Sequence, residues 1–162
     1  MNERQAKLII ERKAAFTLIG IGRDFLKENC YSEIPKFWDE YLTSKERPFQ
    51  GEFGVCIDKD DAIHYLIADV YSPSTAVLPG WETVTFEEGE WAMFMVNGPL
   101  PGSLQTVNTY VWGKWVPENR KYRLRTNYSI EYYPHTVRDT AYTHSEIWLP
   151  VSQKGAIWNP AS

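Results

Sequence analysis

The sequence predicts an α+β fold built from two β-α-β-β units. Two observations lead to it. Strand-like apolar segments alternate with amphipathic segments of helical spacing, and this order occurs twice along the 162 residues. The chain is long enough to bury a core, and its 43% hydrophobic and 23% charged residues are typical of a globular protein. We therefore expect a single domain over residues 1–162, with units at about 14–72 and 81–151.

The first unit begins with residues 14–22, AAFTLIGIG, which are typical of a strand. A helix is expected over residues 32–46, where apolar residues recur at i, i+3, i+4 and i+7: Ile34, Phe37, Trp38 and Tyr41. Two strands are expected over residues 51–58 and 62–71, because the polar sequence KDD between them is a turn signal.

The second unit repeats this order. Residues 81–96 are rich in strand formers, with a bend expected near Gly89. A helix is expected over residues 103–118, where one apolar stripe contains Leu104, Val107, Val111 and Trp115. The last two strands are expected within residues 123–133 and 140–151. In each unit the helix covers one face of a small sheet, so two units could face each other across a groove.

Charge and composition argue against several classes of protein. A net charge of −4 and a pI near 5.4 do not suit a broad nucleic-acid interface. The N-terminal segment MNERQAKLII does not resemble a signal peptide, and no apolar run is long enough to cross a bilayer. We therefore expect a cytoplasmic protein without a membrane partner.

The sequence offers no recognisable metal, cofactor or nucleophile motif. Cys30 and Cys56 fit neither a disulfide framework nor a metal site, and His64, His135 and His144 lack metal-ligand spacing. We therefore predict no metal, no cofactor and no catalytic residue. Aromatic residues are abundant, at 15% with seven Trp and ten Tyr, which suggests a binding cleft in addition to the core.

Two glutamates in strand-like segments are candidates for ligand binding. In NYSIEYYP the alternation places Glu131 on one face with Tyr133, and in SEIWLPV it places Glu146 on one face with Trp148. A carboxylate beside aromatic rings suits a flat cation. The alternatives are a solvated side chain for Glu131 and a rim residue for Glu146. If they form a site, both carboxylates should lie on the cleft sides of the sheets, away from the helices.

Six stretches in order resemble the GyrI-like small-molecule-binding domain, also called the AraC-type effector-binding domain. They are IPKFWDEYL, GVCID with YLIADV, FEEGEWAMFMVNG, YVWGKWVPE, YSIEYYP and SEIWLPV, and they span roughly residues 14–151. The resemblance implies pseudo-two-fold symmetry around a central ligand cleft that takes amphipathic, often cationic, aromatic compounds. It implies that Glu131 is the cation-facing carboxylate and that Glu146 lies on the closing strand. Further cleft candidates at the family's positions are Trp91, Phe53 and Tyr110.

The sequence departs from the family in PENRKYRLRTN, where a turn glycine is often found, so the shape of that loop can differ. The chain also starts too close to its first strand to contain a helix-turn-helix domain, so we expect no direct nucleic-acid binding.

Three functions are compatible with this resemblance. The first is a stand-alone module that senses or sequesters amphipathic cations. The second is a hydrolase of strained, cyclopropane-bearing toxins, in which a cleft glutamate activates water. The third is inhibition of a larger protein such as a topoisomerase.

Overall fold

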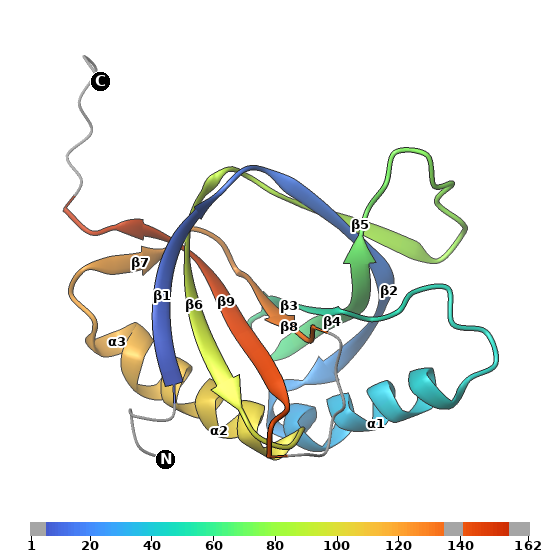
Figure 1. The fold of residues 1–162 in the computed structure, drawn as a ribbon, viewed down its shortest axis with the longest axis horizontal. Helices are drawn as coiled ribbons and strands as arrows, with labels where there is room; N and C mark the ends of the chain where they lie inside the picture. The colour runs from blue at the N-terminus through green and yellow to red at the C-terminus, as the bar shows by residue number, and fades with distance from the viewer. Residues whose placement is uncertain (1–5, 135–140, 156–162) are drawn as a thin grey trace.

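The computed structural model describes residues 6–134 and 141–155, which form one large antiparallel sheet with two helices (Figure 1). The predicted α+β class is therefore confirmed. The strands are β1 (Ala6–Lys13), β2 (Phe16–Leu26), β3 (Phe53–Lys59), β4 (Ala62–Val70), β5 (Trp81–Phe86), β6 (Gly89–Asn97), β7 (Tyr122–Leu124), β8 (Tyr128–Tyr132) and β9 (His144–Gln153). The helices are α1 (Cys30–Thr43), after the short turn η2 (Lys27–Asn29), and α2 (Gly102–Tyr110). The π-helical turn η3 (Val111–Trp115) and the short α3 (Val116–Glu118) continue α2.

The strand order is nearly symmetric about the centre of the sheet, because corresponding strands of the two units occupy corresponding places. It is β1-β6-β9-β8-β3-β4-β2-β5, with β7 paired to β9. Counted outward from the central β3–β8 pair, one unit contributes β3, β4 and β2, and the other contributes β8, β9 and β6. Two strands pair across the units: β1, which precedes the first unit, pairs with β6 of the second, and β5, at the start of the second unit, pairs with β2 of the first. The units therefore join edge to edge in one sheet, whereas the repeated order of elements was also compatible with two units that face each other across a groove.

The observed elements follow the expected ones in order, but β2 extends to Leu26 and residues 123–133 hold two strands, β7 and β8, in place of one. Two further differences have a clear cause. β1 is an additional strand before residue 14, and its many charged side chains hide the apolar pattern of a strand: Lys7, Glu11, Arg12 and Lys13. The second helix is not α-helical throughout, because η3 interrupts it around Gly113.

Both helices pack on the same face of the sheet, called here the helix face (Figure 1). Its core contains Phe37, Trp38 and Tyr41 from α1, Leu104 and Val107 from α2, and inward-facing strand residues such as Tyr65 and Ile147. The opposite face has its own buried cluster, which includes Phe53, Trp91 and Trp148. The sheet curls around this second cluster, since the rings of Phe16 on β2 and Trp91 on β6 lie 5.6 Å apart although four strands separate β2 from β6.

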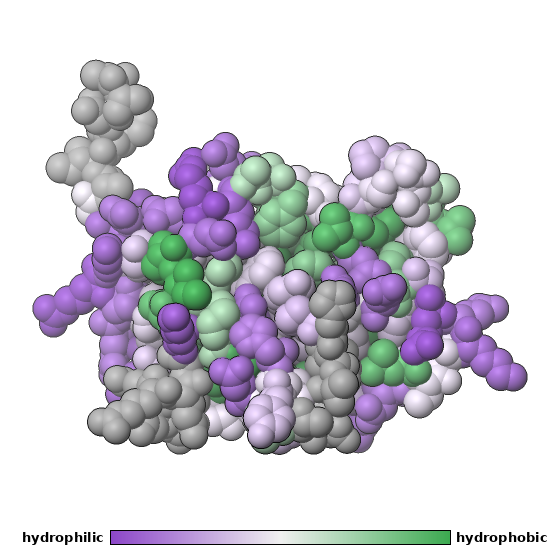
Figure 2. All heavy atoms as spheres, in the orientation of Figure 1, coloured by the Kyte–Doolittle hydropathy of each residue, from purple (hydrophilic) through white to green (hydrophobic). Residues whose placement is uncertain are grey.

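Hydrophilic side chains dominate both ends of the face shown in Figure 2, and its hydrophobic areas form separate patches. The exposed large apolar side chains of the described residues include Leu26, Val70, Val77, Leu78 and Trp112. Of the described helices, none is long and apolar enough to span a membrane.

Candidate ligand pocket between the two helices

An apolar pocket of about 180 Å³ lies on the helix face, between α1 and the start of α2. One wall carries Cys30, Ile34 and Trp38 of α1, and the facing wall carries Leu104 and Asn108 of α2. The sheet supplies Cys56, Ile63, Glu131 and Tyr133. The pocket thus forms where two helices on one sheet leave a gap between them, which is a common position for ligand sites.

Glu131 on β8 is the carboxylate of the sheet that enters this pocket. Its Oε1 atom accepts hydrogen bonds from the Tyr65 hydroxyl at 2.6 Å and from the Tyr133 hydroxyl at 2.8 Å. The Tyr65 oxygen in turn accepts a hydrogen bond from Trp38 Nε1 at 2.7 Å. Because Tyr65 is fully buried, this chain of bonds fixes the carboxylate relative to α1 and β4. Tyr65 and Tyr133 both donate as neutral phenols, so they orient the carboxylate without adding a positive charge.

Gly54 makes this arrangement possible. It lies opposite Glu131 in the register of β3 and β8. A Cβ atom at position 54 would lie 2.0 Å from the Tyr65 hydroxyl oxygen and 3.0 Å from Glu131 Oε1. Only a residue without a side chain lets the Tyr65 hydroxyl pass over β3 to reach the carboxylate on β8.

Three other ionisable groups near Glu131 are held in their protonated forms: Cys56, Tyr65 and Cys30. Burial raises the pKa of the Cys56 thiol well above its ordinary value, and the nearby charge of Glu131 adds to the effect. The same two causes, in the same order, raise the pKa of Tyr65. Burial also raises the pKa of Cys30, although backbone N–H groups of α1 oppose it. Both thiols are therefore poor nucleophiles at neutral pH.

The described lining of the pocket contributes acidic side chains. Its lining includes the carboxylates Glu131 and Asp39, and none of the described lining residues is Lys, Arg or His. Apart from these two acids, the wall is largely aliphatic and aromatic. Such a pocket can hold an apolar ligand that carries positive charge.

The structure brings Glu131 and Tyr133 together, as their alternation indicates, but places Glu146 on the opposite face. The register pairs Glu131 with Ile147 and Tyr132 with Glu146, so the two carboxylates point away from each other across the sheet. Glu146 accepts a hydrogen bond from Trp148 Nε1 at 2.8 Å, and its Oε2 lies 2.7 Å from His144 Nε2. The expectation that both carboxylates lie away from the helices is wrong for Glu131, which occupies the gap between them.

The remaining candidates lie outside this pocket. Trp148, Trp91 and Phe53 belong to the buried cluster of the opposite face. Trp91 is fully buried there, and Phe53 stacks on Tyr132 with their ring centroids 5.0 Å apart. Tyr110, at the end of α2, packs against the core of the helix face but does not line the pocket.

Sequence reasoning missed several residues of the pocket. Tyr65 lies in an apolar strand segment that gives no sign of a polar role, and Trp38 belongs to the apolar stripe that predicts a core position. A signal was present in α1, where Tyr31, Ile34, Trp38 and Leu42 recur at spacings of three or four residues. This stripe lies beside the core-facing stripe, and it is the one that borders the pocket. His135 lies outside the described residues.

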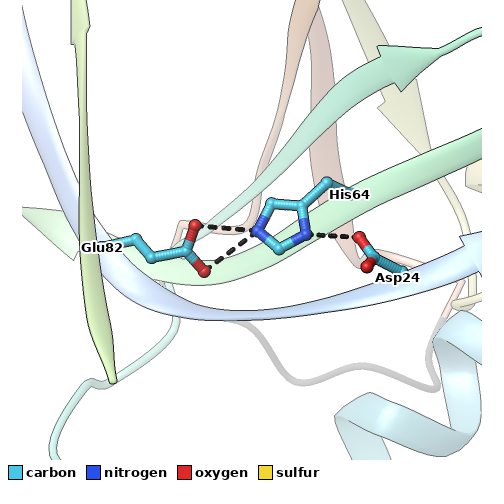
Figure 3. A network of polar contacts seen from close by, with 3 residues as sticks. All are labelled: Asp24, His64 and Glu82. Atoms are coloured by element: carbon cyan, nitrogen blue, oxygen red, sulfur yellow. Dashed lines mark hydrogen bonds and ion pairs between the residues drawn. The ribbon is translucent and has the colours of Figure 1, made fainter. Parts of the chain in front are cut away.

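Two other features of the fold lie apart from this pocket. A wider depression of about 770 Å³ at the start of α2 has no ionisable side chain in its described lining, so it offers no carboxylate to a cation. A second cluster places His64 between Asp24 and Glu82 (Figure 3). Across residues 6–134 and 141–155, however, no group of three or more His, Cys, Asp or Glu side chains is placed to bind a metal ion.

Comparison with solved structures shows that this fold is shared. The structure of SAV2435 bound to tetraphenylphosphonium has a TM-score of 0.73 and 19% identity, over 90% of this chain and 94% of that chain. The integron cassette protein VCH_CASS2 of Vibrio cholerae has a TM-score of 0.65 and 16% identity, over 90% and 95%. The EcmrR C-terminal domain has a TM-score of 0.62 and 15% identity, over 91% and 98%. At these identities the likeness establishes the fold alone.

Comparison of the sequence with family models identifies the family. The model described as an integron-associated effector binding protein, Cass2, matches residues 9–151. No curated protein matches the chain. The matched residues include both units, both helices and Glu131, and thus every element that builds the pocket. The chain therefore belongs to the family of integron-associated effector binding proteins, a GyrI-like family.

Proposed function

We propose that this chain binds amphipathic, aromatic cations in the pocket between α1 and α2, and that it acts by sensing or sequestering them. The observation that carries the proposal is the position of Glu131, whose carboxylate is held by two phenol hydroxyls at the wall of an apolar pocket. A carboxylate in such surroundings favours a ligand that brings positive charge into contact with it.

Approximate energies indicate what kind of selectivity follows. At about 4 Å and an effective dielectric constant near 20, a carboxylate attracts a cation by roughly 4 kcal/mol before desolvation is subtracted. A cation over an aromatic ring such as Trp38 adds about 0.5–2 kcal/mol. Each 100 Å² of apolar surface removed from water adds about 2.5 kcal/mol. The site therefore selects for charge and apolar area more than for detailed shape.

The fold comparison supports this class of ligand. SAV2435, which shares the fold, is described as bound to tetraphenylphosphonium, a cation surrounded by four phenyl rings. The pocket described above combines the same two requirements, since it has a carboxylate and an apolar wall.

Compartment and partners form part of the proposal. Cys30 and Cys56 are free thiols, which suits the reducing cytoplasm. A net charge of −4 disfavours direct contact with nucleic acid. We therefore propose that this fold itself makes no contact with DNA, so that any transcriptional role would depend on another DNA-binding region or protein.

The test compares Glu131→Gln with the parent protein by titration calorimetry, using tetraphenylphosphonium and the neutral triphenylphosphine oxide. We expect the substitution to weaken cation binding by about 1–3 kcal/mol, the range for lost charge-assisted contacts, and to change binding of the neutral compound far less. Equal losses for both compounds would mean that Glu131 shapes the pocket without recognising charge.

Glu146→Gln is the matched control, because it makes the same chemical change on the opposite face of the sheet. We expect it to leave cation binding unchanged. If Glu146→Gln weakens binding of the cation and Glu131→Gln does not, the ligand site lies on the other face of the sheet. Steady consumption of a cyclopropane-bearing electrophile by the parent, lost in Glu131→Gln, would replace the binding role with a hydrolase role.

A further inference from the structure

The pocket as it stands is small for the ligands proposed above. Its volume is about 180 Å³, whereas pockets for drug-sized molecules typically measure about 300–1,000 Å³. If the proposed function is correct, we expect a wall of this pocket to move so that the pocket can enclose a large aromatic cation. The contacts of each wall indicate which one is freer to move.

The sheet side of the pocket is a poor candidate for movement. Glu131, Tyr65 and Gly54 are interlocked through hydrogen bonds and close packing, and Tyr65 is fully buried. The helices differ, because each is anchored separately to the sheet. Phe37 and Tyr41 hold α1, and Leu104 and Val107 hold α2. Movement of one helix relative to the other is therefore limited by what connects them directly.

Tyr31 provides a direct connection. Its hydroxyl lies 2.9 Å from Thr109 Oγ1 and 3.2 Å from the Gln105 carbonyl oxygen, and it accepts a hydrogen bond from Asn108 Nδ2 at 3.0 Å. In the other direction, Gln105 Nε2 donates to the Tyr31 carbonyl oxygen at 2.7 Å. We call these four residues the Tyr31 clasp. Tyr31 belongs to the first turn of α1, and its three partners belong to α2.

The clasp is also part of the pocket wall. Tyr31, Gln105 and Asn108 all line the pocket, so opening the clasp widens the cavity directly. The bonds of the clasp are at the protein surface, where the Tyr31 residue is 43% exposed. Hydrogen bonds between neutral exposed groups contribute little to stability, because water replaces each partner when they separate. The clasp can therefore open without disturbing the core.

We propose that Tyr31 determines the size of ligand that the pocket admits. With the clasp closed, the pocket holds small cations, and a large aromatic cation binds only after the Tyr31 hydroxyl has left α2. Part of the binding free energy of a large ligand is then used to open the clasp, and a small ligand avoids this cost.

The test uses Tyr31→Phe, which keeps the ring and removes the hydroxyl. Calorimetry compares phenyltrimethylammonium, a small aromatic cation, with tetraphenylphosphonium. We expect Tyr31→Phe to raise the affinity for tetraphenylphosphonium by about three- to tenfold, the effect of removing one or two weak hydrogen bonds. Affinity for phenyltrimethylammonium should change by less than about twofold. An equal change for both cations, or no change for either, would overturn the proposal.

Two further variants serve as controls. Thr109→Val removes one partner of the Tyr31 hydroxyl from the α2 side and should give a smaller change in the same direction. Tyr128→Phe makes the same chemical change as Tyr31→Phe on the opposite face of the sheet and should have no effect. Melting temperatures of all variants check that each remains folded.

A measurement without ligand separates this proposal from the proposed function. Cys30 lines the pocket next to Tyr31, so a bulky maleimide should label it slowly relative to N-ethylmaleimide while the clasp is closed. Peptide mass spectrometry gives both rates for Cys30. We expect Tyr31→Phe to raise the bulky-to-small ratio several-fold, and an unchanged ratio would contradict the clasp. If the parent binds neither cation, the proposed function fails, and this ratio still decides whether Tyr31 closes the pocket.

Discussion

The position of the Glu131 carboxylate depends on single neighbouring residues, and one of them, Gly54, contributes by having no side chain. Gly54 leaves the space through which the Tyr65 hydroxyl reaches the carboxylate. In sequence the residue is one glycine in a strand, and nothing nearby marks it as part of a site. Its role follows from the β3–β8 register, which places it opposite Glu131.

Gly54→Ala should therefore destabilise the protein and distort the pocket. The new Cβ atom would overlap the Tyr65 hydroxyl, and overpacking of this kind typically costs about 1–3 kcal/mol. For a chain of this length that corresponds to a decrease in melting temperature of roughly 2–4 °C per kcal/mol. Differential scanning calorimetry measures the decrease, and titration with tetraphenylphosphonium measures the loss of binding.

Gly113→Ala is the matched control, because a Cβ atom at Gly113 meets no atom within 4 Å. This exposed helical position should tolerate alanine or gain stability by up to about 1 kcal/mol. A Gly54→Ala protein as stable as the parent would show that Tyr65 does not need the space above β3.

Among the elements, the strands at one end of the sheet are tied together by an ionisable network. His64 on β4 contacts Asp24 on β2 through Nδ1 at 2.6 Å, and Glu82 on β5 through Nε2 at 2.8 Å (Figure 3). The ring reaches β5 by crossing β2 at Gly22, where a Cβ atom would lie 2.5 Å from Nε2. The imidazole thus connects the edge strand β5 to the two strands beside it.

This network should make stability depend on pH. Burial alone lowers the pKa of His64, but its hydrogen bonds to Asp24 and Glu82 outweigh burial and raise the pKa above the ordinary value of 6.5. Because the folded pKa is the higher one, the stabilisation is fully present below about pH 6.5 and is lost as pH rises through the folded pKa. The melting temperature of the parent should therefore decrease more than that of His64→Gln between about pH 6 and pH 8.5.

The Asp24 and Glu82 side chains are 79% and 43% exposed, so added salt should reduce the difference between the two proteins. Parallel pH profiles of the parent and His64→Gln at low salt would refute the network as a source of pH dependence.

Elements were more predictable from sequence than the relation between them. The alternation of apolar residues correctly paired Glu131 with Tyr133 and Glu146 with Trp148, because alternation is a local property of one strand. Whether the two glutamates share a face depends on the β8–β9 register, in which a shift of one residue would exchange the faces. No local pattern contains that information, so alternation alone could not place the two glutamates on opposite faces, and only the family resemblance distinguished Glu131 as the cation-facing carboxylate.

For the whole molecule, the near-palindromic strand order places β3 and β8 at the centre and β1 and β5 at the two ends. The sequence predicted two similar units, because each unit repeats the same order of elements. It did not predict that the units join in one sheet, since pairing between distant strands leaves no mark in either strand alone.

Backbone hydrogen exchange should follow this order of strands. β1 and β5 each have one neighbouring strand in the described residues, whereas β3, β4, β8 and β9 have at least two. Peptides from β3 and β8 should therefore exchange slowest, and peptides from β1 and β5 should exchange faster than those of the central strands. Exchange mass spectrometry tests this expectation, and a β1 peptide as protected as a β8 peptide would contradict it.

The pairing of β1 across the units also affects the chain while it is being synthesised. β1 leaves the ribosome early, but its partner residues, Gly89–Val96, are added much later. During that interval β1 is a strand without its partner, which is a hazard for association with other nascent chains. Charged side chains reduce such unwanted pairing, and β1 carries four of them: Lys7, Glu11, Arg12 and Lys13. The same charges that obscure the strand pattern of β1 in the sequence therefore protect β1 from pairing with other chains until β6 has been synthesised.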